Sequence, residues 1–278
     1  MNECLGHFYY HNGILKDTQS FDDSFLSSPH YIYEVFRVIE GVALFLEDHL
    51  ERLEETCRLA KHCPGFDSSE LYKQVVLLID KNRLETGNIK VVMRKTNDGM
   101  PELMVYITEH QYPTTLQYTR GVDLLLFKAE RPNPNAKVMD VKLRNATNYV
   151  KQQKEVYETL LVNAEGCITE GSRSNVFFIR QGKVITPPVD EVLPGITRKY
   201  VMEVSRASGL EVVEEKVPAR SLVVMEALFI SGTSRKVLPV RKVDDLDFDP
   251  HHPLMQMIRE AFDLRVADYI RMHKKPFS

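Results

Sequence analysis

The chain has 278 residues, of which 43% are hydrophobic and 27% charged, a balance that excludes a disordered protein and predicts a large core. Its length exceeds that of a typical single domain, which favours two modest domains or one large α/β unit. The 36 basic and 39 acidic residues are spread along the chain and leave a net charge of −3. The chain therefore lacks the basic stripe that would indicate a nucleic-acid partner. The apolar runs are too short to cross a membrane and the N-terminus lacks a signal-peptide pattern, so we expect a cytoplasmic protein.

Short strands and helices alternate in the first third of the chain. Asn12-Gly13 and Glu40-Gly41 are typical of tight turns between antiparallel strands, and Asp48 is placed to cap a helix. The expected elements are paired strands over residues 8–16 and 31–45, helices from residue 48 and over 69–84, and strands over 89–95 and 102–108.

The pattern changes over residues 111–120, where Pro113 and several polar residues interrupt any period. We place the domain boundary here, with a small N-terminal α/β domain over 1–113, a linker over 114–120 and a larger C-terminal domain over 121–278. The elements expected beyond it are strands over 122–129, 141–143, 167–169, 175–187, 211–217 and 227–231, and helices over 146–164, 195–209 and 253–272. The predicted fold class is α+β, with antiparallel hairpins in both domains.

Four short segments of the second half carry residues suited to chemistry: Asp-Val-Lys ending at Lys142, Glu-Gly-Ser-Arg-Ser-Asn at 170–175, Gly-Ile-Thr at 195–197 and Ser-Gly-Thr-Ser at 231–234. Taken singly, they are a surface charge, a turn, a helix cap and a second turn. Taken together, a helix N-terminus with a hydroxyl and a second Gly-Thr turn supply N–H and hydroxyl donors that suit one phosphate monoester. The four cysteines form no Cys-x-x-Cys pair, and neither a disulfide framework nor a metal site is expected.

In order and spacing, these segments resemble the fold-type IV pyridoxal-phosphate enzymes, the class IV aminotransferase family. Branched-chain aminotransferases, D-amino-acid aminotransferases and aminodeoxychorismate lyases belong to that family. The segments that carry the resemblance are YEVFRV at 33–38, EDHLERL at 47–53, DVKLRN at 140–145, ITEGSRSNVF at 168–177, LPGITR at 193–198 and FISGTSRKVLPV at 229–240. The implied fold has two domains like a D-amino-acid aminotransferase, with the cofactor on the larger C-terminal one.

The resemblance implies that Lys142 binds the aldehyde of pyridoxal 5'-phosphate as a Schiff base and moves the substrate proton. Glu170 then faces the pyridine nitrogen, where a carboxylate favours the protonated ring and preserves its capacity to withdraw electrons. Asn175 is expected to support the Glu170 loop or to contact the cofactor. Lys137 and Lys151 lie outside the matching segments and are interpreted as surface charges.

Four residues are implied to hold the cofactor's phosphate, and a fifth lets the backbone approach it: Arg52, Ile196, Thr197 and Thr233, and Gly232. By itself, Arg52 is most simply a surface charge on its helix, and only the other segments favour a charge-assisted phosphate contact. Tyr33 corresponds to an active-site tyrosine of the aminotransferases, but a core aromatic on an alternating strand explains it equally well.

The departures from the family's pattern fall on the substrate side. Residues 27–30, Ser-Ser-Pro-His, replace the glycine-rich turn that usually precedes the Tyr-Glu-Val strand. The arginine and histidine that capture the substrate carboxylate in D-amino-acid aminotransferases have no clean match, and Arg94 is the nearest candidate. Arg144 is either a carboxylate anchor or a surface residue, and Thr147 stands where branched-chain enzymes have a tyrosine.

The predicted reaction is transamination between an amino acid, with branched-chain ones among the candidates, and a 2-oxo acid. The alternatives are a 4-amino-4-deoxychorismate lyase, which releases pyruvate after the same proton abstraction, and a non-catalytic binding protein with this fold. Lyases of the family often have threonine in the strand where this chain has Tyr33-Glu34-Val35, which favours the transaminase. The resemblance also implies a homodimer with the cofactor between the two domains, and it leaves the amino-acid side chain and its L or D stereochemistry open.

Overall fold

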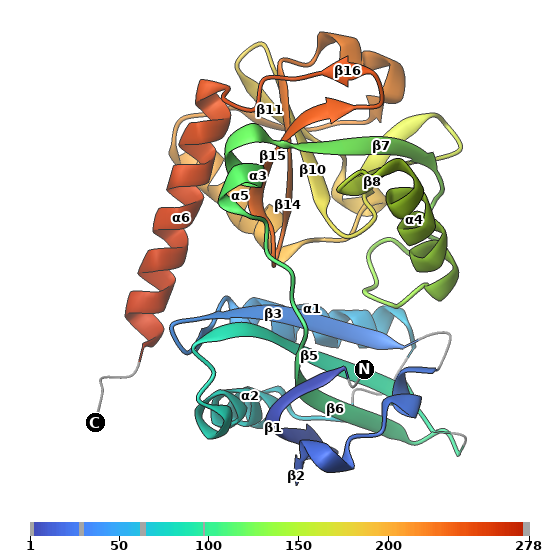
Figure 1. Ribbon diagram of the computed structural model, residues 1–278, viewed down its shortest axis with the longest axis vertical. Helices are drawn as coiled ribbons and strands as arrows, with labels where there is room; N and C mark the ends of the chain where they lie inside the picture. Colours follow the sequence, from blue (N-terminus) through green and yellow to red (C-terminus); the bar gives the residue numbers. More distant parts are fainter. Residues whose placement is uncertain (1–2, 28–30, 62–64, 97, 275–278) are drawn as a thin grey trace. The chain divides into compact units, whose positions relative to one another are not determined.

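The computed structural model describes residues 3–27, 31–61, 65–96 and 98–274 (Figure 1). The chain divides into two compact units. Unit 1 comprises Met1–Gln111, Ala136–Val141 and Val266–Ser278, and unit 2 comprises Tyr112–Asn135 and Lys142–Arg265. Each unit has a sheet of its own, so each builds its own core around the face that its helices cover.

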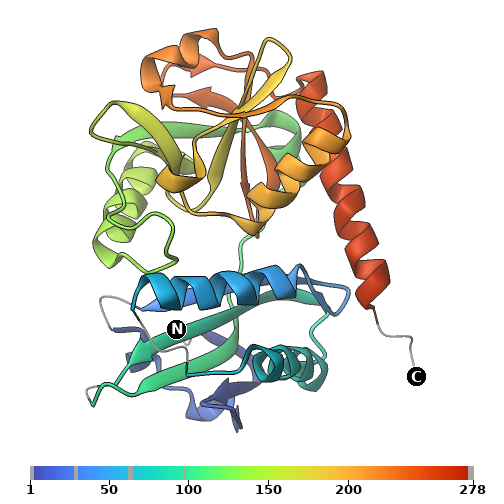
Figure 2. The same ribbon diagram turned by 180° about the vertical axis from the view of Figure 1, so that it is seen from behind.

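Unit 1 is built on a six-stranded antiparallel sheet in the order β2-β1-β6-β5-β3-β4. Its strands are β1 Cys4–His11, β2 Ile14–Asp17, β3 Ile32–Ile39, β4 Val42–Ala43, β5 Thr86–Lys95 and β6 Pro101–Thr108, and its helices are α1 Leu46–Leu59 and α2 Ser68–Asn82, with 3-10 turns at Thr18–Ser20 and Asp23–Ser27. Both helices lie along one face of the sheet (Figure 2). Because side chains alternate along a strand, Phe36 and Val38 of β3 face these helices.

The turn residues of unit 1 behave as their sequence predicts. Asn12 and Gly13 both have positive φ, 48° and 78°, and Glu40 and Gly41 repeat the pattern at 51° and 75°. Two consecutive residues of positive φ make the tight turn whose twist matches that of antiparallel strands. Both predicted strand pairs are therefore confirmed, β1 with β2 and β3 with β4.

The start of α1 differs from the prediction. The helix begins at Leu46, so Asp48 lies inside its first turn and is not the N-cap. Phe45 precedes the helix with a φ of 54°, and the N–H of Leu46 donates to the hydroxyl of Tyr269, 3.2 Å away. A tertiary contact thus takes the place of the expected cap, and the charge of Asp48 suits the positive end of the helix.

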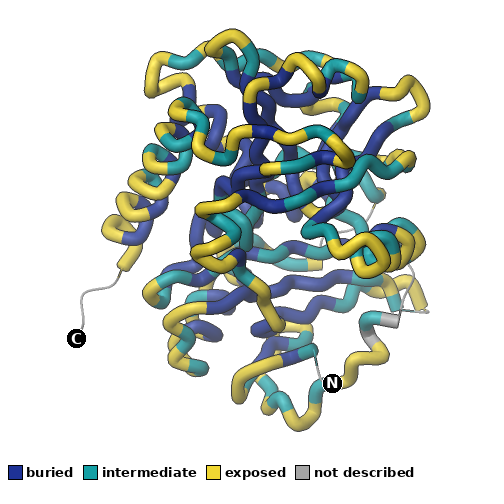
Figure 3. The backbone as a smooth tube through the Cα atoms, turned by 45° about the horizontal axis from the view of Figure 1, so that its top comes forward, coloured by how far each residue is buried: buried dark blue, intermediate teal, exposed yellow. Residues whose placement is uncertain are grey.

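Unit 2 is built on a ten-stranded mixed sheet in the order β12-β11-β10-β14-β15-β7-β8-β9-β13, with β16 paired to β15. Its strands are β7 Val122–Lys128, β8 Glu158–Val162, β9 Cys167–Gly171, β10 Asn175–Arg180, β11 Lys183–Thr186, β12 Val212–Glu214, β13 Val217–Pro218, β14 Ala227–Gly232, β15 Lys236–Val243 and β16 Leu246–Asp247. Its helices are α3 Thr115–Arg120, α4 Val141–Lys154, α5 Ile196–Ala207 and the first part of α6 Pro253–His273, with 3-10 turns at Val189–Glu191 and Ala219–Val224. The first residue of α4, Val141, and the part of α6 from Val266 onward belong to unit 1. In Figure 3 most strand residues are buried, whereas α6 alternates between buried and exposed residues along its length.

Two expectations for the second half are wrong. Residues 141–143 begin helix α4 and form no strand, and the helix expected to reach residue 164 ends at Lys154. Glu155, with a φ of 53°, turns the chain into β8, whose five residues are all buried. A short buried apolar run has no period that separates strand from helix. The linker expected over 114–120 contains α3, which Thr114 and Gln117 cap reciprocally.

Other observations complete the comparison. The strand expected over 211–217 is split into β12 and β13, and β15 and β16 were not anticipated. Cys4, Cys57 and Cys167 are buried, as expected for small apolar side chains, and Cys63 lies outside the described residues. Over the ranges that the structure describes, each helix is too short or too polar to cross a bilayer.

Candidate active site

Lys142 lies in the first turn of α4 with its side chain exposed. The stretch before it belongs to unit 1 and is hydrogen-bonded to the start of β3. The N–H of Met139 donates to the carbonyl of Tyr31 at 2.8 Å, and the N–H of Tyr33 donates to the carbonyl of Lys137 at 3.2 Å. The lysine therefore follows directly on a stretch that the backbone of unit 1 holds in place.

Glu170 and Asn175 flank the turn between β9 and β10, and both bind the segment that precedes α5. The N–H of Leu193 donates to Oε2 of Glu170 at 3.2 Å, and Nδ2 of Asn175 donates to the carbonyl of Leu193 at 2.9 Å. Both side chains are buried, with 3% and 6% of their surface exposed. The structure thus joins two of the segments that the sequence placed in one site.

Arg131 is a site residue that the sequence reasoning missed. Its Nε lies 2.7 Å from Oε1 of Glu170, and its Nη2 donates to the carbonyl of Ser172 at 2.9 Å. The guanidinium balances the charge of a carboxylate that would be costly to bury alone. Arg131 lies in an irregular stretch rich in proline and asparagine. Its charge is the one signal in the sequence that could have indicated a role.

Gly195 is the N-cap of α5, and Asn175 explains why this residue is glycine. A Cβ atom on Gly195 would lie 2.0 Å from Oδ1 of Asn175, well inside any permitted contact. Because the N-cap has no side chain, none caps α5, and no acidic residue lies in its first turn. Ile196 and Thr197 are each 7% exposed. The helix therefore presents uncapped N–H groups and its positive end to an anion.

The Ser231-Gly232-Thr233 turn lies at the end of β14, and Ser231 pairs across the sheet with Asn175. The hydroxyl of Ser231 is buried without a hydrogen-bond partner among the residues that the structure describes. At Gly232 a Cβ atom would come no closer than 3.6 Å to the rest of the chain, at the carbonyl of Arg173. There is thus room beside this backbone for another group.

These features of unit 2 fit the phosphate of pyridoxal phosphate. A phosphate has several acceptor oxygens and a negative charge, and the uncapped start of α5 supplies N–H donors and a favourable dipole. The buried hydroxyl of Ser231 and the space beside Gly232 are the kind of features that a bound ligand completes. The phosphate roles of Ile196, Thr197 and Thr233 stay predictions.

Arg52 lies on α1 and is only 8% exposed, so a surface charge is excluded. Its Nε and Nη2 donate to Oε2 and Oε1 of Glu34 at 3.0 and 2.6 Å, and Nδ1 of His49 lies 3.0 Å from the same Oε1. This two-pronged pair fixes the plane of the guanidinium within unit 1. The phosphate contact of Arg52 stays a prediction.

Burial and neighbouring charges shift the pKa values of Glu34 and His49 in opposite directions. Burial raises the pKa of Glu34, but the charge of Arg52 and the contact with His49 outweigh it and hold this pKa well below its ordinary value. Burial dominates for His49 and lowers its pKa, although Glu34 acts in the opposite direction. His49 is therefore neutral at pH 7, and its Nδ1 carries the hydrogen, because an ionised carboxylate can only accept.

The predicted substrate residues of unit 1 have local partners. Tyr33 is half-buried, with its ring edge-on to that of Tyr31 at 6.0 Å and the ammonium of Lys137 4.9 Å from its ring centre. Lys137, expected at the surface, is half-buried. Nε of Arg94 lies 2.9 Å from Oε2 of Glu102. The structure does not distinguish the two roles considered for Tyr33, and the carboxylate role of Arg94 stays a prediction.

In unit 2, Arg144 is half-buried on α4, and its role also stays a prediction. Lys151, interpreted as a surface charge, is half-buried as well, and its pKa is lowered first by burial and then by neighbouring arginines that include Arg144. The hydroxyl of Thr147 donates to the carbonyl of Leu143 at 2.9 Å within the same helix. Residues 28–30, where the glycine-rich turn is replaced, lie outside the described residues.

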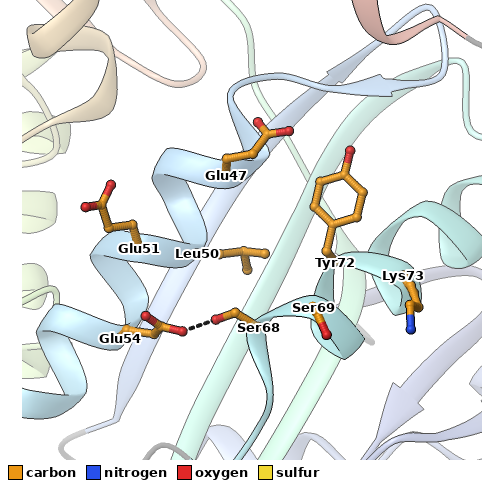
Figure 4. Close-up of a pocket in the computed structure, with 8 residues that line it drawn as sticks. All are labelled: Glu47, Leu50, Glu51, Glu54, Ser68, Ser69, Tyr72 and Lys73. Carbon is orange, nitrogen blue, oxygen red and sulfur yellow. Dashed lines mark hydrogen bonds between the residues drawn. The ribbon is translucent and has the colours of Figure 1, made fainter.

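A groove of about 500 Å³ lies between α1 and α2 on unit 1 (Figure 4). Leu50 and Tyr72 form its apolar walls, and a hydrogen bond from Ser68 to Glu54 crosses between the two helices. The groove is lined by Glu47, Leu50, Glu51, Glu54, Ser68, Ser69, Tyr72 and Lys73. None of these is a predicted site residue, so we assign the groove no part in the candidate active site.

Comparison with known proteins identifies a family for this chain. Residues 31–243 match the family model of class IV amino-transferases. Over 233 residues the chain is 27% identical to a probable branched-chain-amino-acid aminotransferase of Rickettsia bellii, covering 78% of this chain and 80% of that protein. It is 27% identical over 233 residues to a D-alanine aminotransferase of Bacillus licheniformis, covering 77% and 78%.

The fold is shared with solved structures. The branched-chain amino acid aminotransferase of Thermobaculum terrenum, solved with its pyridoxal phosphate, superposes with a TM-score of 0.84 over 98% of this chain and 97% of that one, at 21% identity. Lys142, Glu170, Thr197 and Thr233 lie within the range that matches the family model. This chain belongs to the class IV aminotransferase family, whose enzymes use pyridoxal phosphate.

Proposed function

We propose that this protein transfers an amino group between an amino acid and a 2-oxo acid, with pyridoxal phosphate bound on unit 2. One arrangement carries the proposal. The uncapped start of α5 is linked through Gly195 and Leu193 to Glu170 and Asn175, and Asn175 pairs with the strand that ends in the Ser231 turn. Donors for a phosphate and a carboxylate for a ring nitrogen thus lie on one connected set of residues.

Each residue has a defined task in this proposal. The cofactor supplies an aldehyde that takes up the amino group and a ring that withdraws electrons from the substrate. Thr197 and Thr233 hold the phosphate through N–H and hydroxyl groups, and Ile196 adds its N–H. Gly232 leaves space for the phosphate beside the backbone. The resemblance implies that Arg52 also contacts it. Glu170 keeps a proton on the ring nitrogen. Lys142 supplies the amine that attaches the cofactor and carries the proton of the α-carbon.

The relatives suggest two substrate classes for testing. The Rickettsia bellii protein is named for branched-chain amino acids and the Bacillus licheniformis protein for D-alanine. We propose Tyr33, Arg94 and Arg144 as the residues that select between them, since the resemblance places them on the substrate side. Replacing Arg94 or Arg144 by alanine should raise KM for the amino acid more than it lowers kcat if that arginine binds the carboxylate.

The cofactor assignment is tested by absorbance. Purified protein incubated with pyridoxal phosphate should show the visible band of the lysine-bound cofactor, and borohydride should abolish it. Lys142→Ala should lack the band, whereas Lys154→Ala, an exposed lysine of the same helix, should keep it. A protein that takes up no pyridoxal phosphate would contradict the proposal.

The type of reaction is tested by adding substrates one at a time. A transaminase should convert its bound cofactor to the amino form with a single amino acid and return it with a 2-oxo acid. A 4-amino-4-deoxychorismate lyase should instead release pyruvate with no oxo-acid acceptor. The homodimer and the cytoplasmic location also stay predictions, and sedimentation of the purified protein tests the former.

A further inference from the structure

Glu158, the first residue of β8, is a fully buried carboxylate to which the proposed function assigns no role. Burying an ionised carboxylate is costly unless hydrogen bonds and an opposite charge compensate it. The hydrogen-bond donors and the ion-pair partner of Glu158 come from two turns of unit 2, the β9–β10 turn and the β14–β15 turn.

The β9–β10 turn, residues 171–174, wraps around one oxygen of this carboxylate. The N–H of Arg173 donates to Oε1 of Glu158 at 2.5 Å, and the hydroxyls of Ser174 and Ser172 lie 3.1 and 3.4 Å from the same oxygen. A Cβ atom on Gly171 would lie 2.8 Å from it. The turn is therefore shaped around the carboxylate, with glycine where a side chain would collide with it.

The β14–β15 turn, residues 233–235, is held by the other oxygen. Nε of Arg235 lies 2.9 Å from Oε2 of Glu158. The N–H of Arg235 donates to the carbonyl of Gly232 at 3.0 Å, and its own carbonyl accepts from the hydroxyl of Tyr118 at 2.9 Å. Its guanidinium lies 5.5 Å from the ring centre of Tyr157. Arg235 is thus fixed at both its backbone and its side chain.

We propose that Glu158 is a positioning residue that holds these two turns at a fixed spacing and so prepares the cofactor site before the cofactor arrives. The β9–β10 turn places Glu170 and Asn175, and the β14–β15 turn places Gly232 and Thr233. The inference rests on the proposed function, which assigns these residues to the ring nitrogen and the phosphate. Glu158 touches neither group in this proposal and acts through the turns.

The sheet alone does not supply this spacing. The ladder between β10 and β14 ends at the pair of Asn175 and Ser231, so both turns lie beyond its last backbone contacts. Arg235 also reaches the β9–β10 turn directly, because its Nη1 lies 3.4 Å from the carbonyl of Arg173. Donors that are already in place bind an anion more tightly, because less conformational freedom is lost on binding.

Glu158→Gln tests the proposal, because it keeps the shape of the side chain and removes the charge that pairs with Arg235. The apo-protein is titrated with pyridoxal phosphate and with pyridoxal, which lacks the phosphate. We expect the Kd of pyridoxal phosphate to rise about tenfold or more, and that of pyridoxal to change severalfold less. Asp123→Asn, which breaks the ion pair with Arg241 elsewhere in unit 2, should leave both constants unchanged.

A second variant keeps the test decisive. If Glu158→Gln does not fold, the double variant Glu158→Gln/Arg235→Gln removes both charges of the pair and takes its place. Backbone hydrogen exchange of the apo-variant should be faster at residues 171–175 and 232–235 and unchanged along the strands. A folded variant with unchanged affinity for pyridoxal phosphate, or with equal losses for both ligands, would overturn the role of Glu158. Wild-type protein that takes up neither ligand would contradict the proposed function instead, and the exchange experiment would still decide whether Glu158 orders the turns.

Discussion

Replacing Gly195 with alanine adds one methyl group where Asn175 meets the start of α5. The new Cβ would lie 2.0 Å from Oδ1 of Asn175 and 3.3 Å from Cβ of Arg198, so Asn175 must move. The backbone at Gly195 has a φ of −64°, which alanine adopts without strain, and the cost therefore comes from the collision alone. Overpacking of this kind costs about 1–3 kcal/mol, and losing the hydrogen bond from Asn175 to Leu193 adds about 1 kcal/mol.

We expect Gly195→Ala to lower the free energy of unfolding by about 2–4 kcal/mol, measured by urea denaturation of the apo-protein. The matched control is Gly232→Ala, where the added atom comes no closer than 3.6 Å to the chain. Its free energy of unfolding should change by less than about 1 kcal/mol, while its affinity for pyridoxal phosphate falls because the methyl group fills the space beside the backbone. If Gly195→Ala unfolds at the wild-type urea concentration and binds the cofactor equally well, the contact between Asn175 and α5 has been misjudged.

Acid should destabilise the protein through His49 and Glu34, because both have folded-state pKa values below their ordinary 6.5 and 4.5. As pH falls, the unfolded chain protonates these two side chains before the folded protein does, so the free energy of unfolding should fall below pH 6.5 and again below pH 4.5. In urea titrations at pH 7, 6 and 5, His49→Gln should lose the decline that begins at pH 6.5. Glu34→Gln leaves Arg52 buried without its counter-charge and should cost about 3–5 kcal/mol in unfolding free energy at pH 7, and an unchanged value would argue against the buried pair. Arg131→Gln should destabilise the fold in the same direction by leaving Glu170 unbalanced, seen as a lower melting temperature. Glu170→Gln should lower turnover far more than it weakens cofactor binding, and equal losses in the two measurements would refute its role at the ring nitrogen.

Local signals in the sequence predicted elements whose cause is also local. The turns at Asn12-Gly13 and Glu40-Gly41 need no more than two residues that tolerate positive φ, and both hairpins formed. The end of α4 was missed because Glu155 adopts positive φ without being glycine or asparagine, and the apolar run after it has no distinguishing period. The start of α1 was missed because its first N–H is satisfied by Tyr269, a residue far away in the chain.

In the candidate site, too, some residues could be predicted from local sequence signals and others depend on tertiary contacts. Thr197 and Gly232 were predicted from the sequence itself, because backbone donors at turns and helix starts leave a signature of glycines and hydroxyls in neighbouring residues. Lys142 was predicted from the resemblance of its segment to the family. The partners of the buried charges left no such trace. A glutamate on a strand looks the same in sequence whether it is solvated or buried.

By itself, then, the sequence determined the family. Through its resemblance to that family it also predicted the reactive lysine and the phosphate-binding segments, since each of these segments consists of close neighbours in the chain. Only the tertiary structure decided that Arg131 balances Glu170 and that Arg235 balances Glu158. These pairs arise because a buried carboxylate must find an opposite charge, and the nearest one in space is supplied by whichever distant segment the sheet brings alongside.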